Sequence, residues 1–159
     1  MSEQPQQRRE TATPSQHRQR DELDVCWREY DRIEPGEYLA YCAEVRVYWE
    51  PRFRRNTCLL LWDVFGKDGT TAIARVRTWL NLGDEKGKPC IRRGSNFWEW
   101  WIQANNGNAP KRKGRMSARI FGKRMAAVVI ADSNRNGKTH VAYSIVRQVR
   151  AWETGGGEE

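Results

Sequence analysis

Alternating apolar and polar side chains between residues 36 and 82 predict three consecutive strands. The three runs are Gly36–Glu50, Thr57–Phe65 and Thr71–Leu82. The basic turn Pro51–Asn56 separates the first two runs, and Gly66–Gly69 joins the second to the third. Runs of this kind bounded by turn residues are typical of antiparallel strands. We therefore expect a three-stranded meander.

The pattern also predicts which face of each strand is buried, because successive side chains in a strand point to opposite faces. In the first strand the better core face carries Leu39, Tyr41, Ala43, Val45, Val47 and Trp49. The second strand is apolar on nearly both faces, which favours a central position. The third strand places Ala72, Ala74, Val76, Thr78, Leu80 and Leu82 inward. Its outward face then carries Ile73, Arg75, Arg77, Trp79 and Asn81.

A helix is expected after the meander. Ser95 is a favourable N-cap for a helix over Asn96–Asn105, and Gly107 suits its C-terminal stop. The predicted buried stripe is Phe97, Trp98, Trp101 and Ile102, with Trp100 pointing elsewhere. We expect Trp62, Trp98 and Trp101 in the core.

Two further strands follow the helix. Ser117 is placed to cap a single turn through Phe121 that ends at Gly122. Lys123–Ala131 and Thr139–Val149 then alternate as strands, and the Asn136-Gly137 pair between them is a hairpin signal. The last strand is expected to carry Val141, Tyr143, Ile145 and Val149 on one face and His140, Ser144, Gln148 and Arg150 on the other.

The order β-β-β-α-β-β is that of the OB-fold, a five-stranded Greek-key barrel. We therefore predict a mainly β domain with one main helix over residues 23–152. Residues 1–22 have almost no apolar side chains and predict a disordered tail. Residues 23–35 are expected to form a helical or loop extension, in which Leu23, Cys26, Trp27 and Tyr30 recur at helical spacing and predict a short helix. Residues 153–159 are expected to form a flexible tail.

The net charge of +8 is unevenly distributed. Residues 36–152 carry 22 basic against nine acidic side chains, whereas residues 1–35 carry six against eight. A basic body favours a polyanionic partner, and nucleic acid is the first candidate.

Metal, cofactor and membrane chemistry have little support in the sequence. Cys26, Cys42, Cys58 and Cys90 form no CxxC pair, and His17 and His140 lie far from them. We expect free thiols in a reducing cytoplasm, no cofactor, no metal and no membrane association. The scattered acidic residues, including Asp63, Asp84, Glu85 and Glu99, form no recognisable nuclease signature, so we expect no enzymatic activity.

Candidate nucleic-acid contacts combine arginine or lysine with aromatic rings, because cations bind phosphates and rings stack on bases. The predicted set is Tyr48, Arg52, Phe53, Arg54, Arg55, Arg75, Arg77, Trp79, Lys111, Arg112, Lys113 and Arg115. Each group also has an ordinary structural interpretation. Trp79 is equally suited to the end of the barrel core, and Lys111–Arg115 is equally suited to a solvated linker. The Arg52–Arg55 turn also fits an ordinary solvated turn, but four basic or aromatic residues in a row suit a binding loop better.

Residues Gly36–Val149 resemble small OB-fold proteins of phages and mobile elements that bind single-stranded DNA. The resemblance is carried by Gly36-Glu37-Tyr38, Trp79-Leu80-Asn81-Leu82-Gly83, Gly122-Lys123 and the final hairpin. It implies binding with low sequence specificity in replication or recombination. The terminal Gly-Gly-Gly-Glu-Glu departs from the acidic tail with an apolar anchor found in bacterial single-strand binders.

Two alternatives remain at the level of sequence. The first is a protein-interaction module, in which exposed Trp27, Trp100 and Trp152 mediate a homo-oligomer or contact a replication protein. The second is an RNA-binding OB-fold protein. Competition between matched RNA and DNA oligonucleotides separates the second alternative from single-stranded DNA binding.

Overall fold

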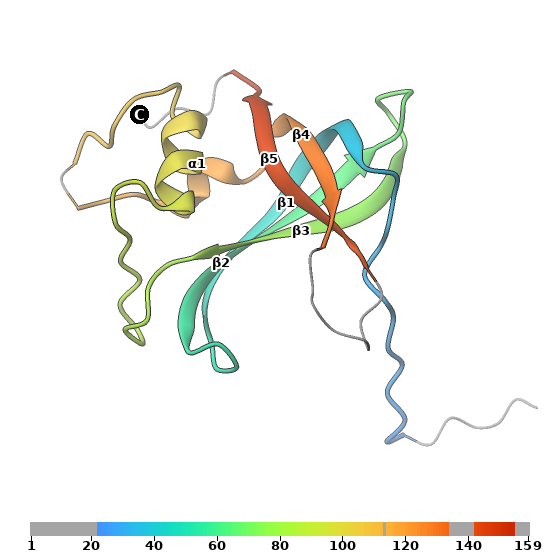
Figure 1. Cartoon of the computed structure of the whole chain (residues 1–159), viewed down its shortest axis with the longest axis horizontal. Coiled ribbons are helices and arrows are strands. Elements are labelled where there is room, and N and C mark those ends of the chain that lie inside the picture. The colour runs from blue at the N-terminus through green and yellow to red at the C-terminus, as the bar shows by residue number, and fades with distance from the viewer. Residues whose placement is uncertain (1–21, 113, 134–141, 155–159) are drawn as a thin grey trace, which may run out of the picture.

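The computed structural model describes residues 22–112, 114–133 and 142–154. Its elements, in order, are β1 (Gly36–Glu50), β2 (Arg55–Phe65), β3 (Ala72–Asn81), α1 (Asn96–Ala104), the 3₁₀ turn η1 (Ala118–Phe121), β4 (Met125–Asp132) and β5 (Ser144–Trp152). Figure 1 shows α1 and η1 together at one end of the strands. The predicted first strand has the observed bounds, and the ends of β2, β3 and β4 differ from the predicted ends by one or two residues.

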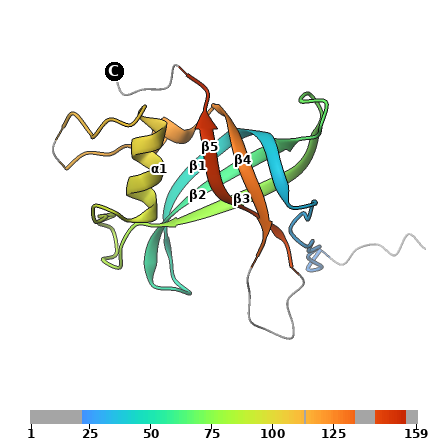
Figure 2. The ribbon, with the colours of Figure 1, turned by 45° about the horizontal axis from the view of Figure 1, so that its top comes forward.

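The five strands form a closed barrel in the order β1-β2-β3-β5-β4. β1 pairs antiparallel with β2 from Ala40 to Glu50 and with β4 from Gly36 to Tyr41, so it bends between two parts of the sheet. β3 meets β5 in parallel at Arg77 and Ile145, which closes the barrel. Figure 2 shows β4 and β5 crossing the meander of β1, β2 and β3. The predicted OB-fold-like architecture is confirmed.

The barrel core is filled by the inner faces of all five strands and by one face of α1. Trp62 and Trp101 are fully buried, as expected, and the Trp62 indole N–H donates to the Thr78 hydroxyl at 3.0 Å. The inward set predicted for β3 is buried except for Ala72, which is exposed. Cys42 and Cys58 lie in this core, and burial raises the pKa of each thiol to about 12.

The core face of β1 differs from the prediction. Ala40 and Cys42 are fully buried, whereas Leu39 and Val47 are each 48% exposed. The pairing with β2 shifts by one residue between Cys42 and Glu44, which marks a β-bulge. Because a bulge reverses which alternate positions face inward, no single set of alternate residues lines the core along this strand.

β5 departs from strict alternation for the same reason. It spans Ser144–Trp152 and so runs past the predicted end at Val149, while the predicted start, residues 139–141, lies outside the described residues. Its pairing with β4 shifts register twice. The buried residues are therefore Ser144, Val146 and Val149, while Ile145 is half-buried. The predicted Asn136-Gly137 turn lies outside the described residues.

The helix α1 begins and ends where its local signals place it. The Ser95 hydroxyl accepts a hydrogen bond from the Trp98 amide, and Gly107 has a positive φ just beyond the helix. Phe97 and Trp101 are buried as predicted, whereas Trp98 and Ile102 are half-buried.

Trp100, which the predicted buried stripe of the helix does not include, lies at the seam between α1 and the barrel. It is half-buried and packs against the core, as does Trp152, whose ring contacts Trp62 and Phe121 at tilted angles. Of the three tryptophans proposed for a protein-interaction surface, only Trp27 is strongly exposed, at 76%.

The predicted N-terminal helix is also wrong. Residues 24–34 have no regular secondary structure, and Leu23 and Trp27 project into solvent. A helix this short is marginal in water unless one face is buried. Here the chain forms tertiary hydrogen bonds instead, through a segment that we call the N-terminal strap, Tyr30–Ile33.

The N-terminal strap forms hydrogen bonds to both β3 and β5 at the place where these two strands share a single register pair. The Asp31 carboxylate accepts from the Arg75 amide at 2.8 Å, and the Asp31 carbonyl accepts from the Ser144 amide at 3.0 Å. The Ile33 amide donates to the Ser144 hydroxyl at 2.8 Å. These bonds satisfy strand-edge groups that the single β3–β5 register pair leaves open, and they hold Tyr30 over the outer face of β3.

Candidate nucleic-acid interface

The outer face of β3 carries the arginines and the tryptophan that the alternation predicts. Arg75 forms an ion pair with Asp63 at 3.1 Å, and the Arg77 guanidinium lies 4.5 Å from the centre of the Tyr30 ring. Trp79 is half-buried rather than part of the barrel core. Its ring lies 6.0 Å from the ring of Tyr30. The N-terminal strap has therefore joined this face and added an aromatic ring to it.

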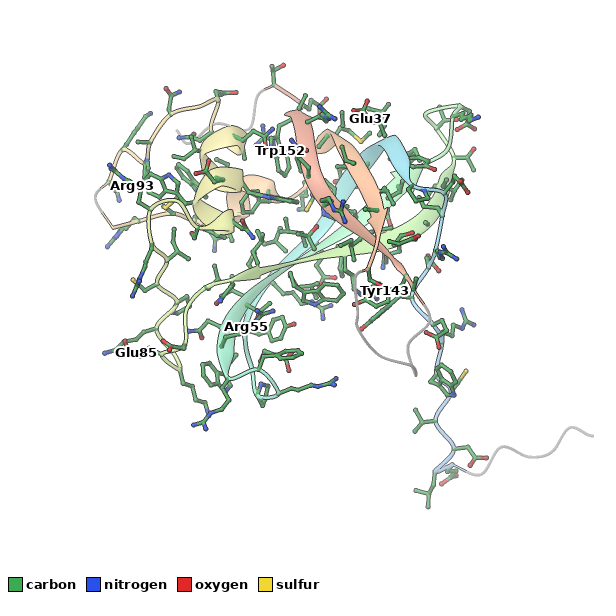
Figure 3. The ribbon with its side chains drawn as sticks, viewed as in Figure 1. Glu37, Arg55, Glu85, Arg93, Tyr143 and Trp152 are labelled. Carbon is green, nitrogen blue, oxygen red and sulfur yellow. The ribbon has the colours of Figure 1, made fainter. Side chains whose placement is uncertain are left out.

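Tyr143 extends the same group of rings from the β5 side of the barrel. Its ring lies 4.9 Å from Tyr30 and 6.2 Å from Trp79, in edge-to-face contacts. Figure 3 labels Tyr143 near the start of β5 and Arg55 near the β1–β2 hairpin. Tyr143 is itself buried, at 8% exposed, so it supports the two neighbouring rings and does not present a face of its own. Tyr30 and Trp79, held by these edge contacts, present ring surface to a stacking ligand at little entropic cost.

A hollow of about 260 Å³ opens where the β1–β2 hairpin meets this surface. We call it the hairpin cavity; it is lined by Tyr30, Tyr48, Glu50, Arg52, Phe53, Arg55, Thr57 and Trp79. Tyr48 and Thr57 are direct cross-strand partners, as are Glu50 and Arg55. Strand pairing thus brings these four side chains to one face.

Charge and aromatic surface meet at the tip of the hairpin. Phe53 is 54% exposed, and the guanidinium groups of Arg52 and Arg55 each lie 5.4 Å from the centre of its ring. Arg54 has a φ of 48° and is exposed, but it does not line the cavity. Two cations beside one accessible ring suit a phosphate next to a stacked base.

Tyr48 lies between opposing influences. Burial raises the pKa of its phenol first, and the nearby Glu50 carboxylate raises that pKa further. A hydrogen bond with Trp79 and the charge of Arg55 act in the opposite direction. The net direction is upward, so Tyr48 stays a neutral phenol, and its ring stacks without adding negative charge.

The second basic segment lies elsewhere. Lys111, Arg112 and Arg115 are exposed on the loop between α1 and η1, and Lys113 lies outside the described residues. This loop borders a different cavity of about 370 Å³. Its lining is largely apolar and comprises Val47, Leu82, Pro89, Cys90, Ile91, Arg93, Phe97, Trp98, Pro110, Gly114, Met116 and Ala118.

The two cavities lie on opposite faces of the hairpin, because Val47 lines one and the next residue, Tyr48, lines the other. The predicted binding residues therefore fall into two groups. The structure brings together Tyr48, Arg52, Phe53, Arg55 and Trp79 around one cavity. Arg77 lies next to this group because its guanidinium contacts the ring of Tyr30, which also lines the cavity. It does not bring the Lys111–Arg115 loop to the same cavity.

Sequence reasoning missed four residues of this surface: Tyr30, Glu50, Thr57 and Tyr143. Tyr30 fitted a helical pattern, and its place depends on the strap. Glu50 and Thr57 could have been found from the sequence. A hairpin whose strands end at Glu50 and begin at Arg55 pairs Glu50 with Arg55 and Thr57 with Tyr48.

Comparison with protein-family models and with the sequences of curated proteins found no match. Within the part of the chain that the structure describes, no helix has the length and apolar character needed to cross a bilayer. The described residues also contain no group of three or more histidine, cysteine or acidic side chains arranged to hold a metal ion.

Proposed function

We propose that this protein binds single-stranded DNA without catalysing a reaction, through the hairpin cavity and the adjoining outer face of β3. The observation that carries the proposal is the gathering of Tyr48, Phe53 and Trp79 with Arg52 and Arg55 around one hollow. Rings bind unstacked bases and arginines bind phosphates, so this combination suits single strands. A duplex keeps its bases stacked on one another and offers these rings much less.

The strong positive charge of residues 36–152 supports the same proposal. Exposed arginines at the hairpin tip would attract the backbone before any base stacks. The Lys111–Arg115 loop would take phosphates only where the strand passes from one face of the hairpin to the other. We place replication or recombination of a phage or mobile element as its setting, on the resemblance of residues 36–149 to proteins of that kind.

The direct test is a titration of a labelled oligo-dT of about 15 nucleotides, within the site sizes known for OB-folds. Fluorescence anisotropy at two salt concentrations should show binding that weakens steeply with salt. Tryptophan fluorescence should be quenched as bases stack near Trp79. Absence of binding at low salt contradicts the proposal.

The site is tested by the double substitution Arg52→Ala/Arg55→Ala. We expect the slope of log K against log salt to fall by about 0.7 for each phosphate that the variant no longer neutralises. Lys67→Ala, which removes one charge instead of two, is the control, because Lys67 is exposed in the β2–β3 turn at the opposite end of β2. An equal reduction per charge removed in both variants would show a general effect of charge and not a site.

A competition between oligo-dT and oligo-U in the same titration tests whether the protein binds RNA. If a matched oligo-U displaces oligo-dT at equal concentration or better, the nucleic-acid ligand is RNA or either strand type. The alternative of a protein-interaction module needs exposed Trp27, Trp100 and Trp152. Two of the three, Trp100 and Trp152, pack against the barrel core and are not free to form such a surface.

A further inference from the structure

Two polar atoms in the wall of the hairpin cavity have no hydrogen-bond partner among the described residues. They are the Thr57 hydroxyl oxygen and the Arg55 Nε, and both are buried. Thr57 as a residue is only 1% exposed. Buried polar atoms in folded proteins are nearly always paired, because an unpaired one has lost its water without replacement. Two of them in one cavity point to a ligand that supplies the missing partners.

A third polar group in the cavity is only partly engaged. One oxygen of Glu50 accepts from the Arg52 amide at 3.3 Å, which is long for such a bond. Glu50 lies directly across from Arg55 in the strand pairing, yet it forms no ion pair within 4.0 Å with any described residue. Its carboxylate therefore retains acceptor capacity at the edge of the cavity.

The size and walls of the cavity restrict the ligand. At about 260 Å³ it is smaller than the 300–1,000 Å³ or so typical of sites for drug-sized molecules. Its aromatic lining comes from Tyr30, Tyr48, Phe53 and Trp79. A single flat ring system with polar edges satisfies both conditions, and in a nucleic acid that group is one base.

The polar groups then discriminate between bases. A carboxylate only accepts, a guanidinium only donates, and a hydroxyl does both. Cytosine, adenine and guanine offer an amino group beside an acceptor, and carboxylates in proteins accept from such amino groups. Thymine and uracil present carbonyl oxygens on both sides of one N–H, and those oxygens would face the Glu50 carboxylate unfavourably.

We propose that the hairpin cavity holds one unstacked base and favours bases with an exocyclic amino group over thymine, with Glu50, Thr57 and Arg55 reading its edge. This inference rests on the proposed function and adds a preference at one position to otherwise unspecific binding. Tyr30 lines the cavity, so the N-terminal strap is part of the recognition surface.

The test compares two oligonucleotides of about 15 nucleotides, within the OB-fold site size. One consists of thymidine and the other of 5-methyl-deoxycytidine. The two bases share ring size and methyl group and differ in the amino group and the adjacent ring nitrogen. We expect the full-length protein to bind the 5-methylcytosine strand at least about fivefold more tightly, the lower end of the discrimination given by specific base contacts.

Two substitutions assign the preference to the cavity. Glu50→Gln replaces a group that only accepts hydrogen bonds with an amide whose NH₂ also donates to a thymine carbonyl. Thr57→Val removes the hydroxyl and keeps the shape of the side chain. Each should reduce the preference toward one, and because the preference is a ratio of two affinities it is read independently of the absolute affinity for either strand. Glu44→Gln is the matched control, because Glu44 pairs with Arg46 on β1 and does not line the cavity.

The outcomes separate this inference from the proposed function. Equal affinity of the wild-type protein for the two strands overturns the base preference while single-strand binding stands. A preference that survives both cavity substitutions also overturns it. If neither strand binds at low salt, the proposed function fails first.

Discussion

At the scale of single residues, two buried threonines in neighbouring strands have opposite hydrogen-bonding states. The Thr78 hydroxyl accepts from the Trp62 indole at 3.0 Å, inside the barrel. The Thr57 hydroxyl, in the wall of the hairpin cavity, has no partner among the described residues. The exposed fractions of Thr78 and Thr57 are 6% and 1%, so burial alone does not distinguish them. The Thr78 hydroxyl thus completes the fold, whereas the Thr57 hydroxyl is one of the groups that we propose to contact a base.

The same substitution at these two sites should therefore change stability in opposite directions. Thr57→Val should raise the free energy of unfolding by about 1 kcal/mol, because it removes an unpaired buried hydroxyl. Thr78→Val should lower it by about 1–3 kcal/mol, because the Trp62 N–H loses its acceptor. Urea unfolding followed by tryptophan fluorescence measures both. Destabilisation of similar size in both variants would mean that the Thr57 hydroxyl is satisfied in solution.

At the scale of elements, the turns are organised by short-range hydrogen bonds. In the β2–β3 turn, one oxygen of Asp68 accepts from the amides of Thr70 and Thr71, both at 3.0 Å. The other accepts from the Thr71 hydroxyl at 2.6 Å. The Thr71 hydroxyl and the two amides hold the pKa of Asp68 well below its ordinary value. A side chain that binds its own following amides defines a turn without help from the barrel.

This turn should make a pH-dependent contribution to stability. Because the folded-state pKa of Asp68 is lowered, the contribution is complete above the unfolded pKa of about 3.9 and declines as pH falls toward the lower folded value. Wild type should therefore melt above Asp68→Asn at pH 7, and the gap should narrow below about pH 4. Asp84→Asn, in the exposed loop after β3, is the charge-matched control. A gap that stays constant down to about pH 2, well below the unfolded pKa, would contradict the assignment.

At the scale of the whole molecule, one buried arginine joins the helical end to the barrel. Arg124 is 7% exposed, and its guanidinium donates to the carbonyls of Ala104, Ile120 and Glu153. It also lies 5.1 Å from the centre of the Trp152 ring. Burial lowers the pKa of this group, and Glu153 opposes that shift. The end of α1, η1 and the end of β5 thus converge on one side chain.

Replacement of this arginine should destabilise the fold more than any hairpin substitution. Arg124→Met leaves three carbonyls without their donor, and we expect a decrease of about 3 kcal/mol or more in the free energy of unfolding. Arg124→Lys should recover only part of that decrease, because an ammonium group lacks the planar fork that reaches three acceptors. Thermal and urea unfolding measure both variants. Lys123→Met, at an exposed neighbouring position, should be nearly neutral.

Much of the fold followed from short-range signals. Ser95 caps a helix whose first amides lie within three residues, and the β3 alternation needs no knowledge of its partners. The same periodicity misled where a partner intervened, because the bulges in β1 and β5 arise from how the strands pair. The charged and aromatic residues of the hairpin were predictable because they are neighbours in sequence. Tyr30 and Tyr143 were not, because their contacts span long sequence separations.

The sequence by itself determined the order of strands and helix along the chain and the capping of the helix. It also determined the outward face of Arg75, Arg77 and Trp79. Each of these depends on residues only a few positions apart. Only the tertiary structure decided that residues 30–33 would leave a helical pattern to fill the gap between β3 and β5. It also decided that Thr57, Glu50 and Tyr30 would line one cavity. The physical reason is that strand-edge groups at the β3–β5 contact need partners, and the N-terminal strap supplies them.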